Sequence, residues 1–103
     1  MKLIQKHLQE IKTLCDNYFV ADLYVFGSVL TENFNPKSDI DFLVRFSGVN
    51  PTEYFDNYMD LKEKLEQILN RHVDLVENQA IKNPIFRKVI DRDKRLFYER
   101  KSA

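Results

Sequence analysis

Three acidic residues and a glycine-serine pair have the types and spacing that phosphate chemistry needs. Asp39 and Asp41 stand two residues apart at the start of an apolar run, residues 39–46, that predicts a strand. Alternate residues of a strand face the same side, which puts these carboxylates roughly 6.7 Å apart along it. Carboxylate oxygens bind Mg²⁺, and two such ions about 3.5 to 4 Å apart can grip the attacking and leaving oxygens of a phosphoryl or nucleotidyl transfer. The spacing therefore predicts a magnesium site.

The Gly27-Ser28 pair follows an apolar run that ends at Phe26, and it predicts a tight turn at the end of a strand. Glycine permits a positive φ or a close approach of the backbone, and Ser28 can cap a short helix that begins there. Free backbone N–H groups at such a turn, with the Ser28 hydroxyl, form a cradle for phosphate oxygens. We therefore expect a triphosphate to lie between this turn and the metal ions.

Taken together, these residues resemble the minimal nucleotidyltransferases of the DNA polymerase beta superfamily, over nearly the whole chain. The family pattern is an apolar residue followed by Gly-Ser, then Asp-apolar-Asp-apolar, then a third carboxylate on a later strand. The matching segments are Phe26-Gly27-Ser28, Asp39-Ile40-Asp41-Phe42 and Val73-Asp74-Leu75. The resemblance implies an α/β fold in which residues 1–103 form one domain, with a small mixed sheet, helices packed mainly on one face and a nucleotidyltransferase palm-like core.

The resemblance also implies a role for each residue of the pattern. Asp39 and Asp41 are expected to bind Mg²⁺, with two ions in the site. Asp74 is expected to complete the catalytic site as a further metal ligand or as the base that takes the proton from an attacking hydroxyl. Gly27 and Ser28 are expected to hold the triphosphate of ATP, the nucleotide donor.

Basic residues are scarce near the Gly27-Ser28 turn and abundant near the end of the sequence. Family members often carry arginines directly after Gly-Ser, where this chain has Val29-Leu30-Thr31-Glu32, so Lys37 is the candidate nucleotide-binding cation. Residues 82–103 carry a net charge of +5, which residues 1–81 balance with −5. The sequence leaves two interpretations of this basic segment open, a solvated helix face or a contact with nucleotide phosphates or an acidic partner.

Minimal members of this family act as antitoxins encoded beside a HEPN-domain toxin, and the activity attributed to them is transfer of AMP from ATP to a tyrosine of that toxin. The resemblance thus implies a Mg²⁺-dependent protein adenylyltransferase whose partner is a HEPN-domain toxin. Two alternatives stay open at this point. The chain could neutralise its partner by binding alone, or it could be a nucleotidyltransferase that acts on a small molecule.

Composition narrows the remaining function classes. A chain of 103 residues allows one domain, and its net charge of zero argues against nucleic acid as the main partner. No apolar run approaches the roughly 20 residues of a membrane span, and the polar start is no secretory signal, so we expect a cytoplasmic protein. The single cysteine, Cys15, excludes an internal disulfide, and its place on an apolar helical stripe predicts a buried free thiol.

Apolar periodicity predicts the elements that position the acidic residues. A long helix should link the strand 39–46 to a strand at 73–77, which gives the right-handed crossover expected if the two strands are parallel. If those strands are neighbours, Asp74 lies on the same face as Asp39 and Asp41. The other predicted elements are an amphipathic helix over residues 3–18, a strand that ends at residue 26, a short helix after Asn83-Pro84 and an apolar patch at 96–98 that is a strand or a helix.

Overall fold

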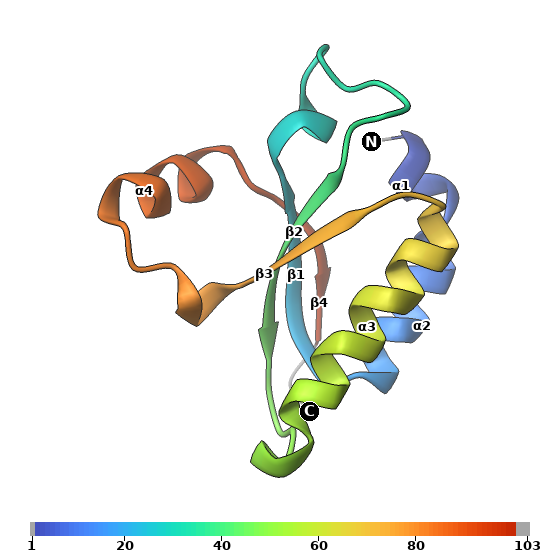
Figure 1. Ribbon diagram of the computed structural model, residues 1–103, viewed down its shortest axis with the longest axis vertical. Helices are drawn as coiled ribbons and strands as arrows, with labels where there is room; N and C mark the ends of the chain where they lie inside the picture. Colours follow the sequence, from blue (N-terminus) through green and yellow to red (C-terminus); the bar gives the residue numbers. More distant parts are fainter. Residues whose placement is uncertain (1, 101–103) are drawn as a thin grey trace.

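A four-stranded mixed sheet organises the computed structural model, which describes residues 2–100 (Figure 1). Its order is β3-β2-β1-β4. Strand β1 pairs antiparallel with β2 and β4, and β2 pairs parallel with β3. This parallel pair is the crossover that the sequence predicts, with a long helix between its strands. The strands are β1 (Val20–Phe26), β2 (Ile40–Phe46), β3 (Val73–Glu77) and β4 (Arg95–Glu99).

The helices lie mainly on one face of this sheet, as predicted. Figure 1 shows α1, α2 and α3 together on one side, with α4 standing apart on the other. No helix within residues 2–100 is long and apolar enough to cross a membrane. The α-helices are α1 (Lys2–Lys6), α2 (Leu8–Asn17), α3 (Tyr54–Leu69) and α4 (Pro84–Asp93), and three short 3₁₀ turns are η1 (Gly27–Leu30), η2 (Pro51–Glu53) and η3 (Asn78–Ala80).

The prediction of one continuous helix over residues 3–18 is wrong at His7. This residue has φ −110° and ψ 22°, outside the helical range, and separates α1 from α2. Its N–H donates to the carbonyl of Ile4 at 3.0 Å, so the chain tightens at this point by an i to i−3 bond. Both halves still bury an apolar side chain, Ile4 in α1 and Ile11 in α2. Apolar spacing therefore predicted the buried face correctly but could not reveal the break.

The main hydrophobic core lies between the sheet and the layer formed by α1, α2 and α3. Strand residues alternate between this core and the opposite face, as the period of two requires. A smaller cluster lies on the opposite face, where Ile90 of α4 packs with Phe26 and Leu43 of the sheet. Cys15 is buried in the main core as expected, and burial raises the pKa of its thiol to about 12, which keeps it protonated and unreactive. The strand residues of the main core include Leu23, Val25, Ile40, Phe42, Val44, Val73 and Leu75.

Candidate active site

The parallel register of β2 and β3 sets Asp41 directly beside Asp74. Neighbouring strands lie about 4.8 Å apart, and residues opposite each other project to the same face. Both aspartates alternate with residues of the main core, so they project away from α2 and α3. Asp39 comes one residue before β2 and lies on this same face by the alternation of the strand. The three carboxylates therefore lie on one face of the sheet, as the sequence predicts.

Asp41 is partly buried and lies close to the two other carboxylates. Partial burial and the negative charges of Asp74 and Asp39 together raise its pKa to about 6, while His72 acts in the opposite direction. Adjacent carboxylates that share a half-buried site repel each other unless a cation lies between them. Within residues 2–100, no Lys or Arg side chain forms an ion pair with these three carboxylates, so the site favours a cation from solution.

Asp39 makes its ion-pair contact with a histidine at the start of β3. The Nδ1 atom of His72 lies 3.3 Å from Oδ2 of Asp39, and both side chains are more than half exposed. The other ring nitrogen lies 3.9 Å from Glu66 of α3, whose carboxylate accepts the N–H of Val73 at 3.0 Å. His72 therefore links Asp39 to the end of α3 and holds it at the solvent edge of the site.

Gly27 lies against the Asp41 carboxylate, and both its backbone conformation and this contact favour glycine. Its φ is +80°, in the region that favours glycine, and a Cβ at this position would collide with Oδ2 of Asp41. The residue is exposed, so the turn at Gly27-Ser28, which we call the Gly27 bend, faces solvent. The contact brings two segments of the predicted motif, the turn and the acidic strand, within van der Waals distance of each other.

Ser28 does not cap the short helix, and the prediction that it does so is wrong. The η1 turn begins at Gly27, so its N-cap position belongs to Phe26, which has extended backbone and no side-chain acceptor. Ser28 lies inside the turn, where its carbonyl oxygen accepts the backbone N–H of Thr31 at 2.9 Å and the Thr31 hydroxyl at 2.8 Å. These bonds close the turn.

The loop between η1 and β2 is anchored by Arg71. Its Nη1 donates to the carbonyl oxygens of Asn35 at 3.3 Å and Ser38 at 3.0 Å, and the guanidinium lies 4.7 Å from the centroid of the Phe34 ring. These contacts fix the backbone directly before Asp39. Lys37, the candidate nucleotide-binding cation, is exposed in this loop and does not line the cavity at Gly27.

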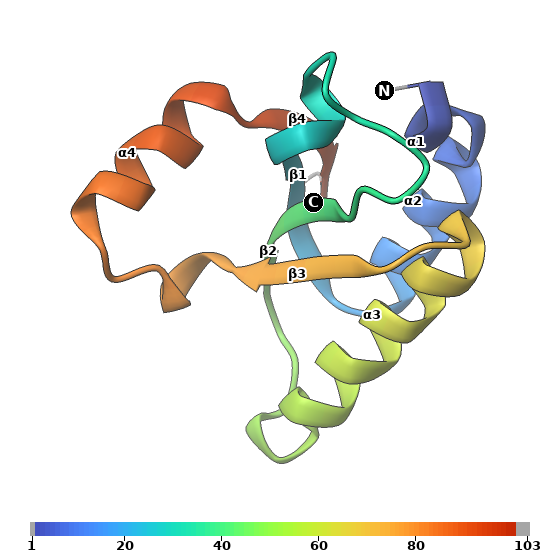
Figure 2. The same cartoon turned by 45° about the horizontal axis from the view of Figure 1, so that its top comes forward.

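A cavity of about 350 Å³ adjoins the bend on the side away from β2, and we call it the Gly27 cavity. Figure 2 shows the η1 turn beside the connection from α4 to β4, the two segments that enclose it. Its lining includes Arg95, the first residue of β4. Sequence reasoning noted the positive charge of residues 82–103 but did not single out this arginine, because nothing in the local pattern marks it. The lining residues are Gly27, Leu30, Thr31, Asp93 and Arg95.

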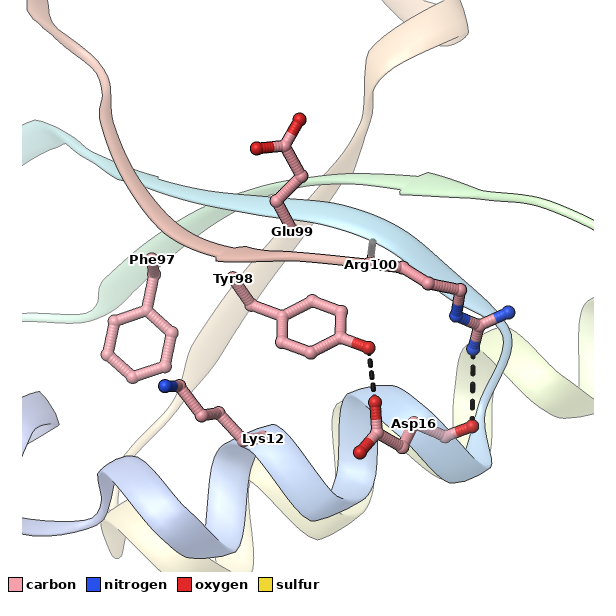
Figure 3. Close-up of a pocket in the computed structure, with 6 residues that line it drawn as sticks. All are labelled: Lys12, Asp16, Phe97, Tyr98, Glu99 and Arg100. Carbon is pink, nitrogen blue, oxygen red and sulfur yellow. Dashed lines mark hydrogen bonds between the residues drawn. The ribbon is translucent and has the colours of Figure 1, made fainter. Parts of the chain in front are cut away.

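A second cavity, of about 420 Å³, lies between α2 and β4, and we call it the Tyr98 cavity (Figure 3). The Tyr98 hydroxyl donates to the carboxylate of Asp16, and Nη2 of Arg100 donates to the Asp16 carbonyl oxygen at 3.2 Å. Tyr98 belongs to the main core, on the face of the sheet opposite the carboxylates. Asp16, Tyr98 and Arg100 are thus joined by hydrogen bonds, while Lys12 and Glu99 of the lining take no part in these bonds.

Asp39, Asp41 and Asp74 lie on one face of the sheet, which we call the carboxylate face. The oxygen donors on this face fit Mg²⁺. Within residues 2–100, no set of three His, Cys, Asp or Glu side chains is arranged to hold a metal by itself. Magnesium is commonly bound by one or two carboxylates together with water and substrate phosphates. The adjacent pair of Asp41 and Asp74, with the exposed Gly27 turn beside it, has the donors that such a site requires. Asp39 is close enough to raise the Asp41 pKa and is the third oxygen donor available.

Comparisons with known proteins agree with this geometry. The sequence profile of the family described as "Polymerase beta, Nucleotidyltransferase" matches residues 9–103. A relative from Methanocaldococcus jannaschii, MJ1379, is 36% identical over 92 residues, which are 89% of this chain and 88% of the relative. Its name places it provisionally among the protein adenylyltransferases.

Solved structures show the same fold. One that is described provisionally as a minimal nucleotidyltransferase has a TM-score of 0.74 at 26% identity and covers 90% of this chain and 91% of its own. Another, an MNT antitoxin in complex with a tri-AMPylated Shewanella oneidensis HEPN toxin, has a TM-score of 0.62 at 20% identity and covers 93% of this chain and 72% of that one. The profile match spans most of the sequence, and the chain therefore belongs to the polymerase beta family of nucleotidyltransferases.

Proposed function

We propose that this chain transfers AMP from ATP, in the presence of Mg²⁺, to a hydroxyl of a partner protein, and that this partner is a HEPN-domain toxin which the transfer neutralises. The observation that carries the proposal is the position of Asp41, which lies between Asp74 on one side and the Gly27 bend on the other. Carboxylates for a metal and a backbone cradle for phosphates meet there. We place the reaction in the cytoplasm, where ATP is available.

Each residue of the site has a part in the proposed reaction. Asp39 and Asp41 hold the metal, with Asp74 as the third carboxylate beside them, and the backbone N–H groups of Gly27 and Ser28 bind phosphate oxygens. Bound Mg²⁺, with two ions expected, offsets the charge of the phosphates and lowers the pKa of an attacking hydroxyl. The hydroxyl oxygen attacks the α-phosphorus in line, and pyrophosphate departs with the electron pair of the broken P–O bond. The exposed Asp74 carboxylate is positioned to accept the proton of the hydroxyl.

The openness of the site supports a protein as the acceptor. Asp39 and Asp74 are exposed, and of the helices only α4 lies on this face of the sheet. A large acceptor can therefore bring its hydroxyl to the carboxylates without displacing another element. The AMPylated HEPN toxin in one structural neighbour and the name of the M. jannaschii relative support the choice of AMP and of a protein acceptor.

The test is to mix the purified chain and a HEPN-domain partner with Mg²⁺ and ATP labelled either at the α-phosphate or at the γ-phosphate. We expect the α-label to become covalently attached to the partner, and the γ-label to leave as pyrophosphate. Chelation of Mg²⁺ should abolish the transfer. A stable complex without label would instead support neutralisation by binding alone, and label that appears only on a small hydroxyl compound would support a small-molecule acceptor.

A further inference from the structure

The Gly27 bend has fewer cations close to it in sequence than a triphosphate requires. ATP brings about four negative charges to its site, and phosphate-binding sites commonly use Arg or Lys to bind them. Between residues 23 and 46 the sequence has two basic residues, Lys37 and Arg45. Arg45 lies 2.7 Å from the Asp22 carboxylate in an ion pair, and Lys37 does not line the Gly27 cavity. Positive charge in addition to that of the metal must therefore come from another part of the chain.

We propose that Arg95 binds the β- and γ-phosphates of the nucleotide and holds them across the Gly27 bend. This inference rests on the proposed function for the presence of a triphosphate, and it assigns to β4 a part in substrate binding. Arg95 is paired with Val25 in the register of β4 against β1, two residues before Gly27. The pairing brings a residue near the end of the sequence to the turn at its centre, and the side chain lines the cavity there.

The charge of Arg95 is free to act on a ligand. Its Nη1 donates to the backbone carbonyl oxygens of Asp93 at 3.1 Å and Lys94 at 3.4 Å, which are neutral acceptors. Within residues 2–100, no carboxylate forms an ion pair with it. Basic residues close to it in sequence are paired, since Lys94 lies 3.0 Å from Asp91. A guanidinium has five N–H donors, so most of those of Arg95 remain for phosphate oxygens.

The one acidic residue of the cavity does not cancel this charge. Asp93 is held by Arg92, whose Nε lies 2.9 Å from Oδ1 and whose Nη2 lies 3.1 Å from Oδ2. This bidentate pair uses the charge of Arg92 to offset that of Asp93. The cavity therefore keeps the positive charge of Arg95, together with the small polar surfaces of Gly27 and Thr31.

The order of the strands identifies which phosphates Arg95 meets. Strand β1 lies between β2, which carries Asp41, and β4, which carries Arg95. The α-phosphorus is attacked at the carboxylates, so the remaining two phosphates extend from that side of Gly27 across the bend. Arg95 is opposite Val25, whose side chain faces the main core, so it does not project over the carboxylates. Its long side chain instead reaches the bend at the end of the sheet, where it lines the Gly27 cavity. Its charge also stabilises the pyrophosphate as the P–O bond breaks, so its removal should lower the rate of transfer as well as the affinity.

The experiment measures the binding of two nucleotides by calorimetry in the presence of Mg²⁺. One is an ATP analogue with a non-hydrolysable α–β bridge, and the other is AMP, which lacks the phosphates that Arg95 contacts. The variants are Arg95→Ala, Arg95→Lys and a matched control, Lys88→Ala, which removes the same charge from an exposed position on α4. Thermal unfolding of each variant shows whether the junction of α4 and β4 stays intact.

We expect Arg95→Ala to weaken binding of the analogue about tenfold, since a hydrogen-bonded charge pair is lost, and to leave AMP binding within about twofold. Arg95→Lys should recover part of the affinity, and Lys88→Ala should change neither. Unchanged analogue binding in Arg95→Ala, an equal loss for both nucleotides, or a wild-type chain that does not bind the analogue would each overturn the inference. If the analogue results are as expected and no protein becomes labelled, Arg95 keeps its assignment and the proposed transfer is wrong.

Discussion

The carboxylate face and the Tyr98 cavity both contain acidic side chains, but the groups that surround these side chains differ. The acidic side chain has hydrogen-bonding partners in the cavity, whereas on the carboxylate face it lies beside other carboxylates. In the Tyr98 cavity, Asp16 accepts the Tyr98 hydroxyl and its own carbonyl oxygen accepts Arg100, so the group is closed by internal bonds. On the carboxylate face, Asp41 is adjacent to Asp74 and its pKa is raised to about 6 by burial and by neighbouring negative charge. The hydrogen bonds in the Tyr98 cavity join α2 to β4. On the carboxylate face, the negative charge of Asp41 and Asp74 has no Lys or Arg partner within residues 2–100, which is characteristic of a site for a charged ligand.

The sharpest way to test this difference is to make the same chemical change in both regions. Asp41→Asn removes a negative charge that the metal needs, so we expect nucleotidyl transfer to fall by at least about a hundredfold. The variant should fold at least as well as the wild type without Mg²⁺, because a repulsion with Asp74 disappears. Transfer of labelled AMP and urea unfolding measure the two effects.

Asp16→Asn is the matched control for this prediction. The substitution weakens the hydrogen bond between residue 16 and Tyr98, so it should lower the free energy of unfolding while the rate of transfer stays close to that of the wild type. Full activity in Asp41→Asn, or a loss of activity in Asp16→Asn equal to that in Asp41→Asn, would show that the two regions do not divide function and stability in this way.

The glycines offer a second comparison, between a bend beside the site and a bend away from it. Gly27 and Gly48 have φ of +80° and +85°, but a Cβ collides with Asp41 at Gly27 and meets nothing within 4 Å at Gly48. Gly48→Ala should cost about 1 to 2 kcal/mol of stability from backbone strain alone and keep its activity. Gly27→Ala should cost more and also displace Asp41, with a large loss of transfer. Equal unfolding free energies and equal rates for both variants would contradict the contact between Gly27 and Asp41.

Much of the carboxylate face was predictable because its geometry follows from short-range rules. Alternation along β2 places Asp39 and Asp41 on one face, and a helix of suitable length between two apolar strands predicts their parallel pairing, which adds Asp74. These rules depend only on spacing, and the sequence shows spacing directly. The direct contact between Gly27 and Asp41 is a tertiary packing detail, and the motif predicted only that the two segments would be near.

Two features could not be predicted from the sequence, the position of Arg95 and the role of Ser28. The first depends on the register between two strands far apart in sequence, and the second depends on the residue at which η1 begins. Arg95 reaches the Gly27 cavity only through the pairing of β4 with β1, and the short apolar patch at 96–98 did not even distinguish a strand from a helix. Ser28 has the right residue type for a cap but stands two residues after the N-cap position, which Phe26 occupies. Single positions of this kind are set by the tertiary arrangement, which no local pattern records.

The response to Mg²⁺ should depend on pH because the metal competes with a proton at Asp41. The pKa of Asp41 is about 6 in the folded chain, above its ordinary value of 3.8. Without metal, the contribution of this group to stability is present below its ordinary pKa and is lost as the pH rises through about 6. Added Mg²⁺ should therefore raise the unfolding temperature more at about pH 7.5 than at about pH 5. An identical shift at both pH values, or a full shift in Asp41→Asn, would argue against metal binding by this carboxylate.

The smallest expected effect is that of Tyr98→Phe. This change removes the hydroxyl that donates to Asp16 and leaves the packing of the ring in place. We expect a loss of about 1 kcal/mol of unfolding free energy and no change in transfer. Burial and the bond to Asp16 raise the pKa of Tyr98 above its ordinary value of 10.0, so its stabilising contribution is present below that pH and is lost as the pH rises through the higher folded value. The difference between wild type and variant in urea unfolding should therefore shrink at alkaline pH. If Tyr98→Phe instead impaired transfer as strongly as it impaired stability, the Tyr98 cavity would have to be coupled to the carboxylates through β4 and β1, and the separation of the two regions would be wrong.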